Sequence, residues 1–345
     1  MEPNQQKPFI GIVLGDPAGI GPEIVLKLLM RPSTYSYAKP VLIGSYDLLC
    51  QTTKRIGCEL FFSRATVESL SEDVDPAYLR GIPVVNIDGD TGAVVLGEVS
   101  ATAGKFAYDS IVCGYGMLDK HLIAAMIMAP ISKQALAISG CGFRSEYELF
   151  AHLAGVSEVQ SVVKGGSLFR SSVIGHVPFR KIIELLSTER IVDTGVGLHH
   201  VLRDILGVSA HICIAALNPH GGEGGILGEE EAEIIIPAVE ELQRRGIDIS
   251  GPYPSDTIYS RAVNNGYDGI IYLYHDQGNI AMKAKMFETT ALIYTNVPYS
   301  ILSTGHGSAM DIAPLGIANA TNLCYVMSTL TTILQKKSGT TEQIR

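Results

Sequence analysis

Long apolar stretches, runs of like charge and paired cysteines are all missing from this 345-residue chain. The longest apolar run, residues 122–130, has about half the length that a membrane span needs. No five or six like charges follow one another and the net charge is −9, so nucleic-acid backbones and anionic membranes are excluded as favoured partners. The six cysteines form no Cys-x-x-Cys pair, which is typical of buried thiols in a reducing compartment.

The first residues also lack the basic and then apolar pattern of a secretory signal. Together with the cysteine pattern, this predicts a cytoplasmic protein. Hydrophobic residues make up 46% of the chain and charged residues 18%, which excludes a disordered chain or a coiled coil and predicts a large buried core. These features are typical of a soluble enzyme that acts on a small molecule, but they do not name a reaction.

Apolar, β-branched runs alternate with helical patterns along the whole chain. Several runs show no polar alternation, as expected of strands that helices cover on both faces. The runs that we predict to be strands are residues 9–14, 40–44, 82–87, 122–128, 158–163, 171–174, 210–217, 269–274 and 290–294. The clearest helical patterns are residues 22–30, 96–117, 188–206 and 227–245. This alternation predicts an α/β fold with a mostly parallel sheet.

No linker rich in proline or serine is long enough to separate independent domains. We therefore expect residues 1–345 to form a single catalytic unit with two lobes, mostly parallel sheets and an interlobe cleft. Lobe 1 is expected at approximately residues 1–145 plus 305–335, and lobe 2 at approximately residues 146–304.

The segment GDPAGIGPE at residues 15–23 follows the first predicted strand. Open α/β sheets bind ligands beyond the carboxyl ends of their strands, and glycines before a helix N-terminus favour an anion. The spacing matches neither the dinucleotide fingerprint nor the P-loop. On this evidence a tight strand-to-helix turn and a binding role are both open.

Three histidines, His176, His220 and His275, also follow predicted strands. Each lies in a polar or glycine-rich segment that is poorly suited to core packing. Three imidazoles with an open position make a catalytic metal site, and such a set suits Zn, Co, Ni or Fe better than Mg or Ca. Spacing alone leaves a metal site and three polar loop residues as equal alternatives.

The stretch GHGSAMDIA at residues 305–313 resembles the cofactor loop of the isocitrate and isopropylmalate dehydrogenases. In those enzymes the loop wraps the adenosine half of the nicotinamide cofactor without a Rossmann motif. The resemblance implies a fold of that type and binding of NAD or NADP. The residues implied to bind the cofactor are His306, Gly307, Ser308, Ala309, Asp311 and Asn319.

Taken in order, seven segments resemble the 4-hydroxythreonine-4-phosphate dehydrogenase family of vitamin B6 synthesis. They are residues 15–23, 129–133, 176–180, 218–225, 251–257, 274–278 and the loop around His306, and they span roughly residues 9–325. The resemblance implies a homodimer of two-lobed α/β subunits with the active site at the subunit interface. It also implies oxidation of a secondary alcohol β to a carboxylate, with hydride transfer to NAD(P) and loss of carbon dioxide.

The same resemblance implies a divalent metal bound by His176, His220 and His275. Zinc is the first candidate, and Co, Ni, Fe, Mn and Mg are the others. Asp256 and Asp276 match family acids near the metal, and Lys283 matches a lysine that binds the substrate. The alcohol proton needs a base, and Asp276, Asp256 and Lys133 remain alternatives for it.

The segment that holds the phosphorylated substrate departs from the family pattern. Where the family has Gly-His-Thr-Glu, this chain has SEYE at residues 145–148, so Glu146 and Tyr147 replace a histidine and a threonine. Counting without a gap from Lys283, an asparagine and an arginine that help to bind the phosphate become Leu292 and Ile301. Burying a phosphate dianion without partners is costly. The sequence therefore predicts a substrate without phosphate.

Three hypotheses stay open at this point. The protein is the vitamin B6 enzyme with an unusual phosphate site, a paralogue that oxidises an unphosphorylated hydroxy acid or a carboxylated cis-dihydrodiol, or a non-catalytic metabolite-binding protein on the same fold. The three histidines and the intact cofactor loop argue against the last, because a binding protein has little need of both.

Overall fold

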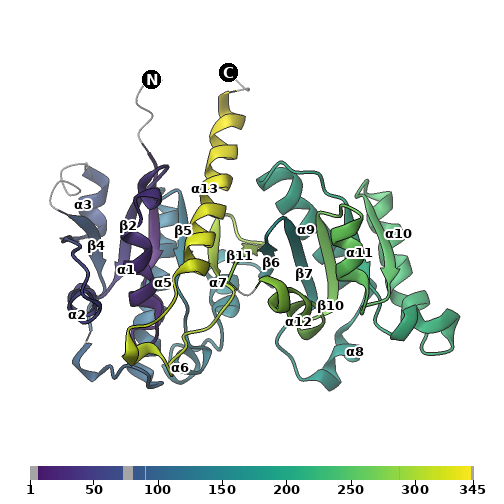
Figure 1. Ribbon diagram of the computed structural model, residues 1–345, viewed down its shortest axis with the longest axis horizontal. Coiled ribbons are helices and arrows are strands. Elements are labelled where there is room, and N and C mark those ends of the chain that lie inside the picture. The colour runs from purple at the N-terminus through teal and green to yellow at the C-terminus, as the bar shows by residue number, and fades with distance from the viewer. Residues whose placement is uncertain (1–6, 73–80, 90, 287, 343–345) are drawn as a thin grey trace. The chain divides into compact units, whose positions relative to one another are not determined.

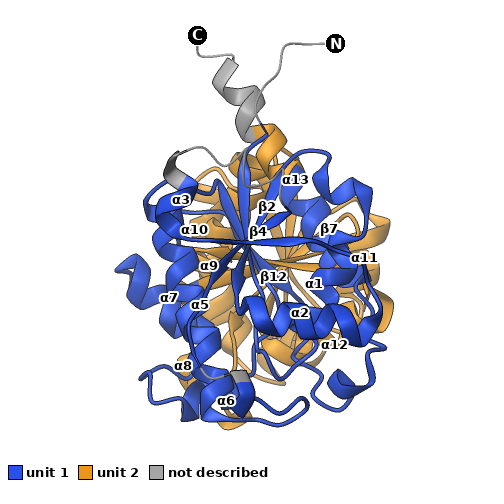
Figure 2. Ribbon diagram, turned by 90° about the vertical axis from the view of Figure 1, so that its left-hand side faces the viewer, with its two compact units in different colours: residues 1–159, 297–331 blue, residues 160–296, 332–345 orange. Residues whose placement is uncertain are grey.

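The computed structural model describes residues 7–72, 81–89, 91–286 and 288–342 (Figure 1). The chain divides into two compact units, shown in different colours in Figure 2. Unit 1 comprises residues 1–159 and 297–331, and unit 2 comprises residues 160–296 and 332–345. The chain therefore passes from unit 1 into unit 2 at residue 160, returns to unit 1 at residue 297 and enters unit 2 again at residue 332.

Unit 1 contains a parallel sheet whose strands follow the order β3-β4-β2-β1-β5-β12. The strands are β1 (Phe9–Val13), β2 (Lys39–Gly44), β3 (Phe62–Ala65), β4 (Ile82–Asn86), β5 (Ala125–Met128) and β12 (Ile301–Thr304). The central strands β1 and β5 are almost wholly buried and apolar, as expected of parallel strands under helices. Because β1, β5 and β12 are adjacent and parallel, the segments that follow them meet at one edge of the sheet.

Four helices of unit 1 begin at a serine whose side chain caps them. Ser45, Ser100, Ser132 and Ser145 each accept a backbone N–H of the first helical turn. The helices are α1 (Gly21–Leu29), α2 (Tyr46–Ile56), α3 (Val67–Glu72), α5 (Ala101–Asp119), α6 (Lys133–Ile138), α7 (Glu146–Ala154) and the start of α13 (Thr321–Glu342), with 3-10 turns at Pro32–Tyr35, Thr91–Ala93 and Ala313–Leu315. Helix α5 packs across β1, β2 and β5.

Unit 2 contains strands in the order β11-β6-β7-β10-β8-β9. They are β6 (Gln160–Gly165), β7 (Leu168–Ile174), β8 (Ile212–Ala215), β9 (Ile249–Tyr253), β10 (Gly269–Tyr274) and β11 (Thr290–Thr295). Strand β6 is antiparallel to both β7 and β11, whereas β7, β10, β8 and β9 run parallel. A two-residue turn with Gly166 at φ 56° joins β6 to β7, and such a turn forces the two strands to run in opposite directions.

The helices of unit 2 cover this sheet. They are α8 (Ile182–Leu185), α9 (Thr188–His200), α10 (Ile236–Arg244), α11 (Ile258–Asn264) and α12 (His275–Met286), with short helical turns at Phe179–Lys181, Val201–Ile205, Pro219–Gly225 and Glu231–Ile235. Helix α9 packs on β6, β7 and β10, and α12 packs on β7 and β10. The hydrophobic core of this unit includes Tyr272, Cys213 and Ile270, all almost fully buried.

The predicted α/β class with a mostly parallel sheet is confirmed. Sequence patterns missed β3, β9 and β12, because these strands are short and β9 contains a Gly-Pro pair that is untypical of strands. The helix expected at residues 96–117 begins only at Ala101, after the Ser100 cap. Within the residues that the structure describes, no helix has the length and apolar character needed to cross a membrane.

Candidate functional site

The three histidines singled out from the sequence all follow adjacent parallel strands of unit 2. His176 follows β7, His275 follows β10 and His220 follows β8, and these strands are neighbours in that order. Their carboxyl ends therefore lie along one edge of the sheet, where α/β proteins bind ligands. The fold of unit 2 thus collects, at one edge, residues that are far apart in the sequence.

His176 and His275 lie together. Their ring centroids are 4.6 Å apart and the ring planes are inclined by 49°. Nδ1 of His275 lies 2.8 Å from Oδ1 of Asp276, which leaves Nε2 for a cation. A carboxylate on the other ring nitrogen is the usual support of a histidine that binds a metal. The paired imidazoles therefore offer two ligands to a divalent cation, and Asp276 orients one of them.

His220 does not join them in a group of three. It is exposed, and its backbone has the left-handed φ of 54°, which continues through Gly221 and Gly224. Across the described ranges, no set of three His, Cys, Asp or Glu side chains is close enough together to hold a metal ion. The structure brings two of the three predicted ligands together and places the third on a neighbouring loop.

A buried carboxylate that the sequence analysis did not single out holds the start of this loop. Glu231 is 5% exposed, and its Oε1 accepts the backbone N–H groups of Leu217 and Asn218, each at 2.8 Å. Its Oε2 accepts the side-chain amide of Asn218, also at 2.8 Å. Such charge-assisted bonds are strong, so Glu231 fixes the segment that leads to His220. The available signal was an acidic run, residues 229–231, just after the glycine-rich loop.

Gln277 connects three of the strand ends. Its Nε2 donates to the Ala216 carbonyl and to Ser255 Oγ, both at 2.8 Å, and its Oε1 accepts the N–H of Leu273 at 2.7 Å. The segments after β8, β9 and β10 are thereby tied together. Asp256 follows Ser255 and is exposed. Gln277 lies in the motif at residues 274–278, whose pattern predicted no role for it.

A buried arginine holds α12, the helix that begins with His275, against β7. Arg170 is 7% exposed and donates to the side chain of Asn279, which is 8% exposed. On the same helix, Asp276 and Lys283 are both exposed and lie seven residues, or about two turns, apart. Both therefore lie on one face of α12, so that this face presents a carboxylate and an ammonium group.

In unit 1, residues 15–23 pack against the segment that follows β12. The Ile20 N–H donates to the Ser308 carbonyl at 3.0 Å. A Cβ at Gly19 would come within 2.8 Å of Ser308, so only glycine allows this approach. The motif at residues 15–23 therefore packs closely against residues 305–319, which we call the cofactor loop.

The cofactor loop presents groups that suit a dinucleotide. Gly307 and Asp311 are exposed, and a Cβ at Gly307 would meet no atom within 4 Å. The Ser308 hydroxyl is buried without a hydrogen-bond partner in the described part of the chain. Ala309 has a left-handed φ of 42°, and His306 Nδ1 lies 3.0 Å from the Gly307 carbonyl. Small residues, an orphaned hydroxyl and an exposed carboxylate fit an adenosine moiety.

Asn319 closes the cofactor loop at the start of α13. Its Oδ1 accepts both the N–H and the hydroxyl of Thr321, at 2.8 and 2.7 Å. This contact orders the first turn of the helix. Asn319 thus has a structural role in addition to the role that the resemblance implies.

Asp16, inside the first motif, is a buried carboxylate without surface exposure. Its Oδ1 accepts the Ala18 N–H at 2.8 Å. Burial raises the pKa of this carboxyl, and backbone N–H groups of Ala18 and Ser132 offset the effect only in part. A carboxylate kept at some cost in stability is a feature of functional sites.

Lys133, Glu146 and Tyr147 lie together in unit 1. Lys133 Nζ is 3.6 Å from Glu146 Oε1 and 5.5 Å from the centre of the Tyr147 ring. Glu146 is 7% exposed and stands in the first turn of α7. The lysine that was a candidate base is therefore paired with the carboxylate that replaces the family's histidine.

Of the two positions matched to lost phosphate ligands, Leu292 is half-buried on β11 and Ile301 is fully buried on β12, where it pairs in register with Met126. They belong to different units of the chain. Neither side chain can donate a hydrogen bond to a phosphate.

The family model described as pyridoxal phosphate biosynthetic protein PdxA matches residues 36–329. A provisionally named D-threonate 4-phosphate dehydrogenase from Symbiobacterium thermophilum is 32% identical over 92% of this chain and 94% of its own length.

Among solved structures, a 4-hydroxythreonine-4-phosphate dehydrogenase from Klebsiella pneumoniae is 29% identical, with a TM-score of 0.81, over 95% of this chain and 99% of that one. A terephthalate 1,2-cis-dihydrodiol dehydrogenase from Burkholderia xenovorans LB400, at 24% identity and a TM-score of 0.62, covers 95% of this chain and 98% of its own; at that identity it shows the fold alone. The expected family is confirmed: the chain belongs to the pyridoxal phosphate biosynthetic protein PdxA family, and its relatives mark it as a dehydrogenase that acts on a CH–OH group.

Proposed function

We propose that the protein is an NAD(P)-dependent, metal-dependent dehydrogenase that oxidises a secondary alcohol β to a carboxylate, with loss of carbon dioxide, and that its substrate carries no phosphate. Family membership supports the reaction class. The substrate class rests on one observation, the pairing of Lys133 with Glu146 at 3.6 Å. A carboxylate in that position repels a phosphate dianion, and it already engages the nearby cation.

The residues of unit 2 would hold the metal and the substrate carboxylate. His176 and His275 would bind the cation, with Asp276 fixing the orientation of the His275 ring. We propose His220 as the third ligand, since a Cβ at Gly221, Gly224 or Gly225 would meet no atom within 4 Å and the loop has room to adjust there, whereas Gly222 packs against Glu231. When bound, a divalent cation supplies Lewis-acid polarisation of the alcohol and carbonyl oxygens. Lys283 would pair with the substrate carboxylate.

The residues of unit 1 would hold the cofactor, whose chemistry when bound is acceptance of a hydride. Asp311 would accept a hydrogen bond from a ribose hydroxyl, and Ser308 and Gly307 would lie against the adenine. Asp276, Asp256 and Lys133 remain candidates for the base that removes the alcohol proton. A homodimer with its active site at the subunit interface is part of the proposal.

The test is reduction of NAD and NADP over a panel of phosphorylated and unphosphorylated β-hydroxy acids and carboxylated cis-dihydrodiols, with and without a chelator. We expect turnover of an unphosphorylated compound and its loss on chelation. The second candidate is a phosphorylated substrate, which the name of the Symbiobacterium relative favours. Efficient turnover of 4-phosphohydroxy-threonine or D-threonate 4-phosphate would establish it instead. No turnover, together with no binding of metal or NAD(P), would point to a metabolite-binding protein.

A further inference from the structure

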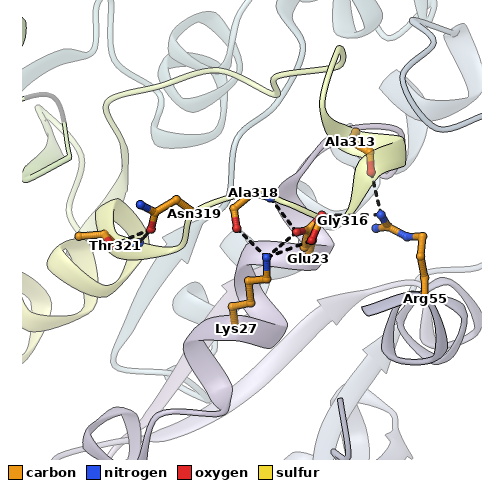
Figure 3. Close-up of polar contacts among 8 residues, drawn as sticks. All are labelled: Glu23, Lys27, Arg55, Ala313, Gly316, Ala318, Asn319 and Thr321. Atoms are coloured by element: carbon orange, nitrogen blue, oxygen red, sulfur yellow. Dashed lines mark hydrogen bonds and ion pairs between the residues drawn. The ribbon is translucent and has the colours of Figure 1, made fainter. Parts of the chain in front are cut away.

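Glu23 is a fully buried carboxylate on α1 that binds the cofactor loop and two neighbouring cations, Lys27 and Arg55 (Figure 3). Its Oε1 accepts the backbone N–H of Ala318 at 2.8 Å and the ammonium of Lys27 at 2.7 Å. Acidic side chains are almost never fully buried unless they are paired. Here the pairing joins the first helix of the chain to a segment nearly three hundred positions later.

Lys27 binds the same stretch of the loop through its other donors. Its Nζ donates to the Ala318 carbonyl at 2.7 Å and to the Gly316 carbonyl at 3.3 Å. Ala318 is therefore held through both its N–H and its C=O, by a carboxylate and an ammonium that also bind each other. Both bonds involve a charged partner, which makes them stronger than neutral bonds.

Arg55 extends the network from α2. Its Nη1 donates to the Ala313 carbonyl at 2.7 Å and lies 3.6 Å from Glu23 Oε2 (Figure 3). The three charged side chains thus hold residues 313–318 from two helices. This segment has little regular structure beyond the turn at Ala313–Leu315, so its backbone depends on such partners for a fixed course.

We propose that Glu23, Lys27 and Arg55 are positioning residues for the cofactor loop, and this inference rests on the proposed NAD(P)-dependent function. They set the course of the backbone between Asp311 and Asn319, and thereby the placement of the groups that meet the adenosine half of the cofactor. None of the three is required to touch the cofactor. Their loss should therefore weaken cofactor binding more than it slows turnover at saturation.

The test measures the dissociation constants of NADH and NADPH by calorimetry, on the full-length protein and on the variants Glu23→Gln, Lys27→Met and Arg55→Gln. The Glu23→Gln variant keeps the size of the side chain and removes its charge. We expect its cofactor dissociation constant to rise roughly tenfold, as for the loss of one charge-assisted hydrogen bond. We expect KM for the cofactor to rise with the dissociation constant and kcat to change little. At position 27 we expect the conservative variant Lys27→Arg to retain part of the cofactor binding that Lys27→Met loses.

The matched control is Asp109→Asn, which neutralises the acid of an exposed i,i+4 pair with Lys105 on α5 and should leave the cofactor dissociation constant unchanged. Unaltered cofactor binding in folded Glu23→Gln and Arg55→Gln proteins would overturn the positioning role and leave the proposed function intact. A wild-type protein that binds neither NADH nor NADPH would overturn both. Failure of all three variants to fold, judged by circular dichroism, would show a general stability element and also overturn the inference.

Discussion

The imidazole rings of His176 and His275 lie 4.6 Å apart between centroids, because each follows one of two adjacent parallel strands. This pair is the part of the predicted metal set that the structure brings together, and it gives the first of four predictions.

Replacing His176 or His275 by alanine should weaken Zn²⁺ binding at least about tenfold, because each change removes an imidazole donor. The same change at His220 tests whether that loop supplies the third ligand, and we expect a similar loss. Titration calorimetry with Zn²⁺ measures each affinity. The control is His200→Ala, at the end of α9, whose ring pairs with Asp204 in the helical turn Val201–Ile205 that follows. Equal zinc affinity in the wild type and all three variants would rule out this metal site.

Replacing Glu231 by glutamine should lower the free energy of unfolding by about 1–3 kcal/mol. Both backbone N–H groups bind one oxygen, Oε1, which glutamine can keep, but the second oxygen, which accepts the Asn218 side-chain amide, becomes an NH2 group that faces another donor. Urea denaturation measures the change. Glu229→Gln, on an exposed neighbour, should change stability little. We also expect the Glu231 variant to bind Zn²⁺ more weakly, since the segment before His220 is loosened. A stability equal to that of the Glu229 variant would contradict the role given to Glu231.

Replacing Glu146 by glutamine should shift preference toward phosphorylated substrates. Removing the carboxylate frees the Lys133 ammonium and ends the repulsion of a phosphate, so the ratio of kcat/KM for phosphorylated over unphosphorylated substrates should rise roughly tenfold. Glu148→Gln is the matched control on the same helix, where the carboxylate accepts the Arg144 N–H. An unchanged ratio would mean that Glu146 does not select against phosphate.

Because the pKa of Asp16 is raised in the native state, the free energy of unfolding should depend on pH through this residue. The native state holds the Asp16 proton more tightly than the unfolded chain, in which the carboxyl has its ordinary pKa of 3.8. The contribution of Asp16 to stability therefore falls as pH rises from that value through the native pKa, and stays unfavourable above it.

Asp16→Asn should consequently be more stable than the wild type near pH 7, with the difference shrinking toward about pH 4. Asparagine keeps the oxygen that accepts the Ala18 N–H. Chemical denaturation across this pH range measures the difference, with the exposed Asp47→Asn as control. A variant that is less stable at every pH would show that the ionised carboxylate stabilises the fold.

The sequence by itself determined the family and the α/β class. Strands β1, β5 and β10 are buried, apolar runs whose patterns are visible without a structure, and the motifs after them are specific. The short strand β12 and the Gly-Pro strand β9 were not predictable in this way, because local pattern is weak there and their pairing partners are distant in sequence.

Only the tertiary structure decided which charged groups act together. Nothing in local sequence links Glu23 to Ala318, Glu231 to Leu217 or Lys133 to Glu146, since each contact depends on which strands are neighbours in a sheet or on which helix covers a loop. A motif fixes the type of side chain and its place at a strand end. Strand order decides its partner, and strand order is set by packing over the whole unit.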